Sequence, residues 1–225
     1  MTTINAVHLT NVSKFYRGGL VTALKDVSLE FNLGSFIIIG GPSGSGKSTL
    51  LNMIGGLDRP SSGQIRILDR DYSSMSENKL TRFRRKHIGF IWQFGNLFPS
   101  LTALQNVMMP LDFDPSWSYS DAKRRAFDVL NYLGLSERIN HKSNQMSGGE
   151  QQRVSIARAI VNNPSIILAD EPTGNLDFEN GTLIAELLQR LNNEQKITII
   201  VVTHDIDLFR RFSEIIPMKD GRMNV

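Results

Sequence analysis

The chain has 225 residues and a mass of 25.2 kDa, enough for one large domain or two small ones. Hydrophobic residues make up 40% and charged residues 21%, a composition that excludes a disordered or fibrous protein. The net charge of +3 is small for a protein that binds nucleic acid through charge alone, so we expect no direct nucleic-acid partner. There is no cysteine, which excludes disulfides, thiolate metal sites and cysteine nucleophiles.

The sequence predicts neither a secretory signal nor a membrane span. Its N-terminus lacks a basic stretch followed by an apolar one. Residues 87–111 carry no fixed charge, but Gln93, Asn96, Pro99 and Gln105 interrupt them, whereas a span needs about 20 mainly apolar residues. We therefore expect a soluble protein whose association with a membrane comes through a partner.

The N-terminal third is predicted to consist mainly of strands. Apolar alternation or continuous apolar runs indicate strands at residues 7–12, 27–31 and 36–39. A helix is expected from Lys47 to Ile54, where two glycines follow. A turn rich in proline, serine and glycine then leads to a strand at 64–68.

The middle third is predicted to be helical. Either Ser118 or Ser120 caps a helix with apolar residues at helical spacing, and Gly134 ends it. A second helix is expected to begin after Ser147 and to end before Pro164. These helices would form an insertion into the rest of the fold.

The last third is predicted to alternate between strands and helices. Strands are expected at 166–168 and 197–202, with a helix through the apolar residues of 183–191 between them. Asp220-Gly221 indicates a hairpin that joins 215–218 to 223–225. Buried strands that alternate with helices indicate an α/β fold with a parallel sheet covered on both faces.

The strongest chemical signal is a phosphate-binding loop between a predicted strand and a predicted helix. Glycines at 44 and 46 let its backbone N–H groups point at phosphate oxygens. Lys47 would contact the β- and γ-phosphates, and the Ser48 hydroxyl would bind Mg²⁺. The loop consists of Gly41, Pro42, Ser43, Gly44, Ser45, Gly46, Lys47, Ser48 and Thr49.

An Asp-Glu pair follows the apolar residues 166–169. Asp170, at the end of a buried strand, is a candidate Mg²⁺ ligand, and Glu171 is placed to orient or deprotonate an attacking water. Alone, such a pair usually marks only a strand end. Downstream of a phosphate loop it indicates nucleotide hydrolysis, and the long intervening segment is more than a small nucleotide kinase or GTPase needs.

Several short motifs resemble those of ATP-binding-cassette (ABC) ATPases. Residues 144–153, which contain MSGGE, resemble the signature motif usually written LSGGQ. Gln93 matches the Q-loop glutamine, 174–177 the D-loop, and His204 the switch histidine, while Tyr16 matches the aromatic residue that stacks on adenine. Because the motifs occur in family order over nearly the whole chain, it is identified as a member of that family.

The resemblance implies an α/β fold, with a P-loop NTPase core and mostly parallel sheet, an N-terminal antiparallel β subdomain and an inserted helical subdomain. Residues 1–225 would form one nucleotide-binding domain, with the core at 1–92 and 163–225 and the helical subdomain at 93–162. ATP and Mg²⁺ are the expected cofactors, and a second copy of the chain the expected partner.

The resemblance also assigns roles to residues. The expected catalytic residues are Lys47, Gln93, Glu171 and His204. The expected Mg²⁺ ligands are Ser48, Gln93 and Asp170. Beyond the phosphate loop, nucleotide contacts fall to Tyr16, Asp170, Ser147, Gly148, Gly149 and Asp177. In the family, the serine and glycines of the signature face the γ-phosphate bound to a second, antiparallel copy.

The signature departs from the family pattern at two positions. Met146 in place of leucine conserves volume and is expected to be mild. Glu150 in place of glutamine adds a negative charge near the expected triphosphate, which is locally repulsive. Alternatively, its side chain points along the helix towards Arg153 or Arg158.

Within the family, the chain resembles cassettes of the lipoprotein-release and macrolide-export type, on residues 23–27, 80–90, 101–107 and 172–177. This implies an integral membrane permease as partner and a location at the cytoplasmic face of the membrane. Residues 94–103 are then either helical-domain core or part of the cleft for a permease helix. The basic cluster of Arg82, Arg84, Arg85 and Lys86 is either a solvated face or a contact with lipid phosphates or acidic partner residues.

Other functions remain open alternatives. A cell-division cassette that transmits force belongs to the same group. A soluble ABC ATPase acting on nucleic acid or ribosomes usually carries two cassettes or a long insertion, which this chain lacks. A P-loop kinase of small molecules does not account for the signature motif. The sequence does not indicate the transported substrate.

Overall fold

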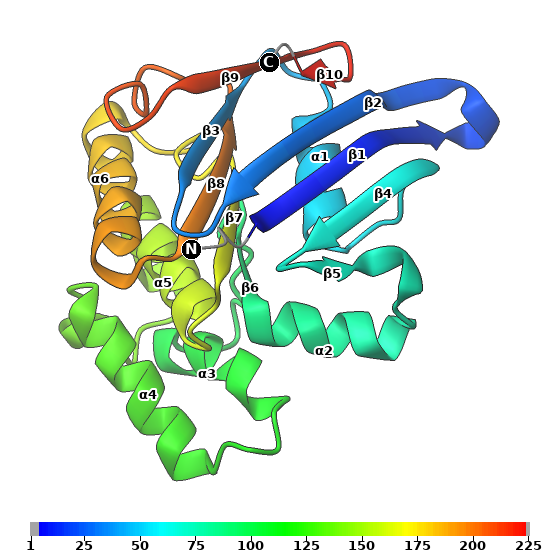
Figure 1. The fold of residues 1–225 in the computed structure, drawn as a ribbon. Coiled ribbons are helices and arrows are strands. Elements are labelled where there is room, and N and C mark those ends of the chain that lie inside the picture. Colours follow the sequence, from blue (N-terminus) through cyan, green and yellow to red (C-terminus); the bar gives the residue numbers. More distant parts are fainter. Residues whose placement is uncertain (1–4, 224–225) are drawn as a thin grey trace.

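The structure, a computed structural model, describes residues 5–223 and arranges them as two β-sheets with helices between and beside them (Figure 1). The first sheet is antiparallel, with strand order β2-β1-β4-β5. Its strands are β1 (Asn5–Tyr16), β2 (Val21–Asn32), β4 (Ser62–Ile67) and β5 (Arg70–Asp71). The strands predicted at 7–12 and 27–31 are confirmed as parts of a longer hairpin, in which Tyr16 still pairs with Val21.

The second sheet is mostly parallel, with strand order β10-β9-β3-β8-β7-β6. Its strands are β3 (Phe36–Gly40), β6 (Ile88–Ile91), β7 (Ile166–Asp170), β8 (Thr198–Thr203), β9 (Ile215–Lys219) and β10 (Arg222–Met223). All residues of β3 and β8 are buried, as expected for central strands covered on both faces. The carboxyl ends of β3, β7 and β8 meet at one edge, because Gly40 pairs with Thr203 and Asp170 with Val202.

Alternate residues of β3 belong to two different hydrophobic cores. Ile37 and Ile39 lie in the core between the two sheets, which also contains apolar residues of helix α1 (Lys47–Ile54). Ile38 faces the other core, which contains apolar residues of four further helices. These helices are α3 (Ala103–Asp112), α4 (Tyr119–Tyr132), α5 (Gly148–Ile160) and α6 (Phe178–Gln195).

Two helices and two strands were not predicted: α2 (Glu77–His87), α3, β5 and β6. Helix α2 buries only Leu80 and Phe83, so its apolar periodicity is weak. Helix α3 begins with a capping box between Thr102 and Gln105, inside a segment of mixed apolar residues and turn formers. Within 5–223, no helix is long and apolar enough to span a membrane.

The ends of two predicted elements differ in detail. The strand expected at 64–68 ends at Ile67, because Leu68 and Asp69 adopt φ values of 49° and 59° in the turn to β5. Ser118 rather than Ser120 caps α4, since its side chain accepts a hydrogen bond from the backbone of Asp121. The C-terminal hairpin is confirmed as far as Met223, and residues 224–225 of the prediction lie outside the described residues.

Candidate functional site

The phosphate loop connects β3 to α1 at the edge where the parallel strands end. Gly46 caps α1 with φ 103°, and a Cβ atom there would lie 2.4 Å from the Ala23 carbonyl oxygen of β2, so no other residue fits. The Lys47 ammonium donates to the carbonyl oxygens of Gly41 at 2.8 Å and Pro42 at 2.9 Å. A buried positive charge therefore lies inside the curl of the loop.

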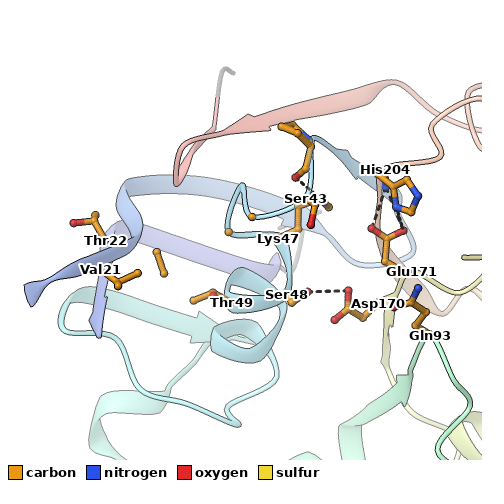
Figure 2. A pocket seen from close by; sticks show the side chains of 14 residues that line it. Val21, Thr22, Ser43, Lys47, Ser48, Thr49, Gln93, Asp170, Glu171 and His204 are labelled. Atoms are coloured by element: carbon orange, nitrogen blue, oxygen red, sulfur yellow. Dashed lines mark hydrogen bonds and ion pairs between the residues drawn. The ribbon is translucent and has the colours of Figure 1, made fainter. Parts of the chain in front are cut away.

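A cavity of about 680 Å³ opens beside this loop. Val21 and Thr22 lie at one end of it and Gln93, Glu171 and His204 at the other, with the phosphate loop between them (Figure 2). It is lined by Val21, Thr22, Ala23, Pro42, Ser43, Gly44, Gly46, Lys47, Ser48, Thr49, Gln93, Asp170, Glu171 and His204. The fold thus brings together residues that the sequence separates by more than 150 positions.

Ser48 and Asp170 form an oxygen pair near the middle of the cavity, where the Ser48 hydroxyl donates to Asp170 Oδ1 at 3.1 Å (Figure 2). Burial raises the pKa of Asp170, and the hydrogen bond from Ser48 partly opposes this rise. A hydroxyl and a carboxylate are the ligand types that Mg²⁺ prefers. Because no group of three or more His, Cys, Asp or Glu side chains in 5–223 could hold a metal ion, a cation here would need phosphate oxygens and water as further ligands.

The side chain of Glu171 is bound by residues at the end of strand β8. Its carboxylate accepts hydrogen bonds from the Thr203 hydroxyl at 3.0 Å and from the His204 backbone N–H, and His204 Nδ1 lies 2.9 Å from Oε2. The backbone of Glu171 has φ 47°, a conformation that non-glycine residues rarely adopt. Strain of this kind is typical of functional sites, where surrounding contacts maintain it.

Some expected site residues do not line this cavity. The Tyr16 hydroxyl donates to Asp58 at 2.9 Å, and the Lys14 ammonium lies 4.9 Å from its ring centroid. Tyr16 nevertheless stands opposite Val21, which does line the cavity. Gly41 and Ser45 belong to the loop but do not line the cavity, and the Ser45 hydroxyl is buried without a hydrogen-bond partner in residues 5–223.

The signature residues Ser147, Gly148 and Gly149 lie at the start of α5, outside this cavity. Gly149 packs against the start of α6, because a Cβ atom there would lie 2.7 Å from Asn180 Oδ1, and Gly148 lies beside Leu176. Asp177 caps α6 and accepts two hydrogen bonds from Asn180. The structure therefore places Asp177 beside the signature.

The sequence did not predict two contributions to the site, one that lines the cavity and one that holds a lining residue. One is the 21–23 segment of β2, for which the only signal was its place in a hairpin opposite Tyr16. The other is Thr203, which binds Glu171. Its position just before His204, at the end of a buried strand, was the available signal.

The expectation that Glu150 points to Arg153 or Arg158 is wrong. Its side chain turns back to the helix N-terminus and pairs with Arg138, whose Nε lies 2.7 Å from Oε1. Arg158 is instead bound to the carbonyl oxygens of Gly95 and Asn96. Capping favours this direction, since an acidic side chain in the first turn satisfies free backbone N–H groups.

The family profile described as "ABC transporter" matches residues 24–174, which contain the phosphate loop, Asp170 and Glu171. The chain belongs to the ABC transporter family. As a member of this family, it is an ATP-binding cassette with ATPase chemistry.

Relatives match the cassette over nearly its whole length. MJ0796 of Methanocaldococcus jannaschii, described as an uncharacterized ABC transporter ATP-binding protein, is 49% identical over 222 residues, 96% of this chain and 94% of that protein. A solved dimeric structure of MJ0796, in a post-hydrolysis state bound to ADP and Pi, has a TM-score of 0.88 and 47% identity over 97% of both chains.

Two further relatives carry functional names. The lipoprotein-releasing system ATP-binding protein LolD of Bacteroides fragilis is 44% identical over 217 residues, 96% of this chain and 99% of LolD. The macrolide export ATP-binding/permease protein MacB of Bdellovibrio bacteriovorus is 45% identical over 218 residues, 96% of this chain but only 33% of MacB.

Proposed function

We propose that this cassette is the ATP-binding and ATP-hydrolysing subunit of a transporter of the lipoprotein-release or macrolide-export type, and that it drives a separate membrane permease. The observation that carries the proposal is the single cavity in which Lys47, Asp170, Glu171 and His204 surround the phosphate loop. Similarity to LolD and MacB supports the transporter type.

The nucleotide would lie along the cavity. Its triphosphate is placed at the N-terminus of α1, where loop N–H groups and the Lys47 ammonium favour negative charge. Its adenine is placed at the 21–23 end, where Tyr16 on the paired strand provides a stacking face.

The oxygen ligands described above fit a magnesium ion. Ser48 and Asp170 would hold it, with Gln93 at the far end of the same cavity. When bound, Mg²⁺ would neutralise charge on the β- and γ-phosphates. Asp170 is suited to this role because its side chain is half-buried and lacks an ion-pair partner among the described residues.

Hydrolysis requires a positioned water and stabilised negative charge more than covalent chemistry. Glu171 is proposed as the base that orients this water and takes its proton. The contacts from Thr203 and His204 would fix the direction of its carboxylate. His204 would then bind the γ-phosphate through its exposed imidazole.

Two copies are proposed to share two ATP molecules. Because Ser147, Gly148 and Gly149 lie outside the cavity of their own copy, we infer that they face the γ-phosphate bound to the second copy. The N-terminus of α5 would add favourable dipole potential to that phosphate. Loss of the γ-phosphate would weaken this contact and open the pair.

The permease would contact a second groove, of about 450 Å³, between β6, the 92–98 loop and the end of α3. Its lining includes Trp92, Phe98 and Phe113, large side chains suited to an apolar helix face, and the guanidinium groups of Arg85 and Arg158. The groove lies near the start of the proposed helical subdomain (93–162), between it and the proposed core (1–92 and 163–225). Through this permease the cassette would lie at the cytoplasmic face of the membrane.

The experiment is capture of membrane partners with the Glu171→Gln variant, which should bind ATP without turning it over. Tagged variant protein is added to detergent-solubilised native membranes with Mg-ATP, and bound proteins are identified by mass spectrometry. The expected result is a stoichiometric integral membrane protein that is absent without nucleotide. Recovery of only soluble or nucleic-acid-bound partners would instead favour a non-transport ABC ATPase, and a division-complex partner would favour force transmission.

A further inference from the structure

The carboxylate of Glu150 divides its two oxygens between the helix backbone and an arginine. Oε2 accepts a hydrogen bond from the Ser147 backbone N–H at 2.8 Å, and the Ser147 hydroxyl accepts one from the Glu150 N–H at 3.3 Å. Oε1 is 2.7 Å from Arg138 Nε. Glu150 is therefore fixed in the first turn of α5, directly beside the serine assigned to the γ-phosphate of the second copy.

This position creates an electrostatic conflict. A helix N-terminus favours one bound anion, and the side chain of Glu150 already occupies part of that favourable potential. A phosphate brought to the same end meets a like charge at short range. Protonation does not remove it, because Arg138 and the Ser147 backbone hold the pKa of Glu150 below its usual range.

Arg138 is the group that can cancel this charge. It ends a short 3-10 helix, Ser136–Arg138, and is the described residue that forms an ion pair with Glu150. The Glu150 side chain is 18% exposed and that of Arg138 41%, so the pair is partly shielded from water but is still open to screening by salt. Arg158 cannot balance this charge, because its guanidinium donates hydrogen bonds to the carbonyl oxygens of Gly95 and Asn96.

We propose that Arg138 is a positioning residue for ATP-driven association of two copies: its guanidinium pairs with Glu150 and removes the repulsion that this carboxylate would exert on the γ-phosphate of the opposite copy. The inference rests on the proposed function, in which Ser147 faces that phosphate. It explains how a signature motif with glutamate in place of glutamine remains compatible with a triphosphate. It also makes the arginine necessary only while position 150 is negatively charged.

The test is a double-mutant cycle in the Glu171→Gln background, which stabilises the ATP-bound pair of copies. Association with Mg-ATP is measured by analytical ultracentrifugation for the parent, Arg138→Met, Glu150→Gln and the Arg138→Met/Glu150→Gln double variant. Arg138→Met should weaken association about tenfold, as expected for one uncompensated charge near a phosphate. In the Glu150→Gln background the same substitution should change association by less than about twofold.

Three controls separate charge from structure. Arg138→Lys should restore most of the association, because it keeps the positive charge. Arg124→Met removes an exposed ion pair within α4 and should leave association unchanged. At about 1 M salt, where the Debye length is about 3 Å, the Arg138→Met defect should shrink, whereas a folding defect would not.

Equal loss of association in both backgrounds, or no loss in either, would overturn the proposal for Arg138 while the two-copy arrangement stands. Failure of the parent itself to associate with Mg-ATP would overturn the proposed two-copy site and this inference with it. Thermal unfolding of every variant identifies any that has lost its fold. If Arg138→Met is such a variant, the association constants of Arg138→Lys and Glu150→Gln decide the outcome.

Discussion

The phosphate-loop cavity and the start of α5 differ in how complete each is within one copy of the chain. The cavity unites residues from both sheets, includes both carboxylates of the Asp-Glu pair and binds its own lysine inside the loop. The start of α5 presents a serine and two glycines beside its own cap, the start of α6 and Arg138. In the proposed function, the cavity is a nearly complete site within one copy, and the start of α5 completes the site of a second copy.

The two regions also differ in whether their charged groups are already paired within one copy of the chain. In the proposed function, Lys47 and the loop N–H groups would bind an anion in the cavity, and Asp170 would bind a cation. At α5, the helix N-terminus is already occupied by Glu150, which is balanced by Arg138. Under these proposals the cavity would take up charged ligands, whereas the start of α5 would keep its own charges balanced beside a phosphate.

The largest effect is expected from Glu171→Gln. Removal of the general base should lower kcat for ATP hydrolysis about 10²- to 10⁴-fold, because the attacking water loses its proton acceptor. ATP binding should persist, since the phosphate loop is untouched. Steady-state phosphate release and equilibrium nucleotide binding test this directly, and rapid hydrolysis by the variant would falsify the base assignment.

A mixture of two inactive variants tests the division of the site between copies. Lys47→Ala removes the phosphate contact, and Ser147→Arg blocks the start of α5, so each variant alone should be inactive. In a random mixture, half of the pairs contain one of each, and each of these pairs holds one working site, so about a quarter of the wild-type ATPase activity should return. A mixture that stays inactive would mean that the two regions do not act across an interface.

Tyr16→Ala should raise the KM for ATP about tenfold, the usual value of stacking on one base, with little change in kcat. Tyr16→Phe keeps the ring and should remain within about twofold of the wild type despite losing the hydrogen bond to Asp58. Phe15→Ala, one residue away on an exposed position, is the matched control. A larger rise in KM for Phe15→Ala than for Tyr16→Ala would mean that Phe15, and not Tyr16, stacks on adenine.

Asp170→Asn should abolish Mg²⁺-dependent turnover yet raise the Tm of the nucleotide-free protein at pH 7 by about 2 °C. Burial raises the pKa of Asp170 in the folded state. The charged carboxylate therefore lowers the free energy of unfolding at a pH above that pKa, and this destabilisation disappears as the pH falls. The effect stays small because the side chain is partly exposed and solvent screens its charge. Scanning calorimetry at pH 7 and pH 4 should show the difference in Tm shrinking at the lower pH.

The amino-acid sequence by itself determined the phosphate loop, the Asp-Glu pair and most of the strands, because each depends on neighbouring residues. Glycine at 46 is required by a local positive φ, and buried strands such as β8 are recognisable from a short apolar run. Elements with weak periodicity escaped prediction, as α2 did with only two buried apolar residues.

Only the tertiary structure decided which side chains meet. Thr203 binds Glu171 because parallel strands end at one edge, and Val21 lines the nucleotide end because a long hairpin carries it there. Arg138 pairs with Glu150 because the chain before α5 folds back to the helix N-terminus, whereas helical spacing alone suggested Arg153 or Arg158. Charges at a helix end are balanced by whatever the fold brings within a few ångströms, and sequence spacing does not specify that neighbour.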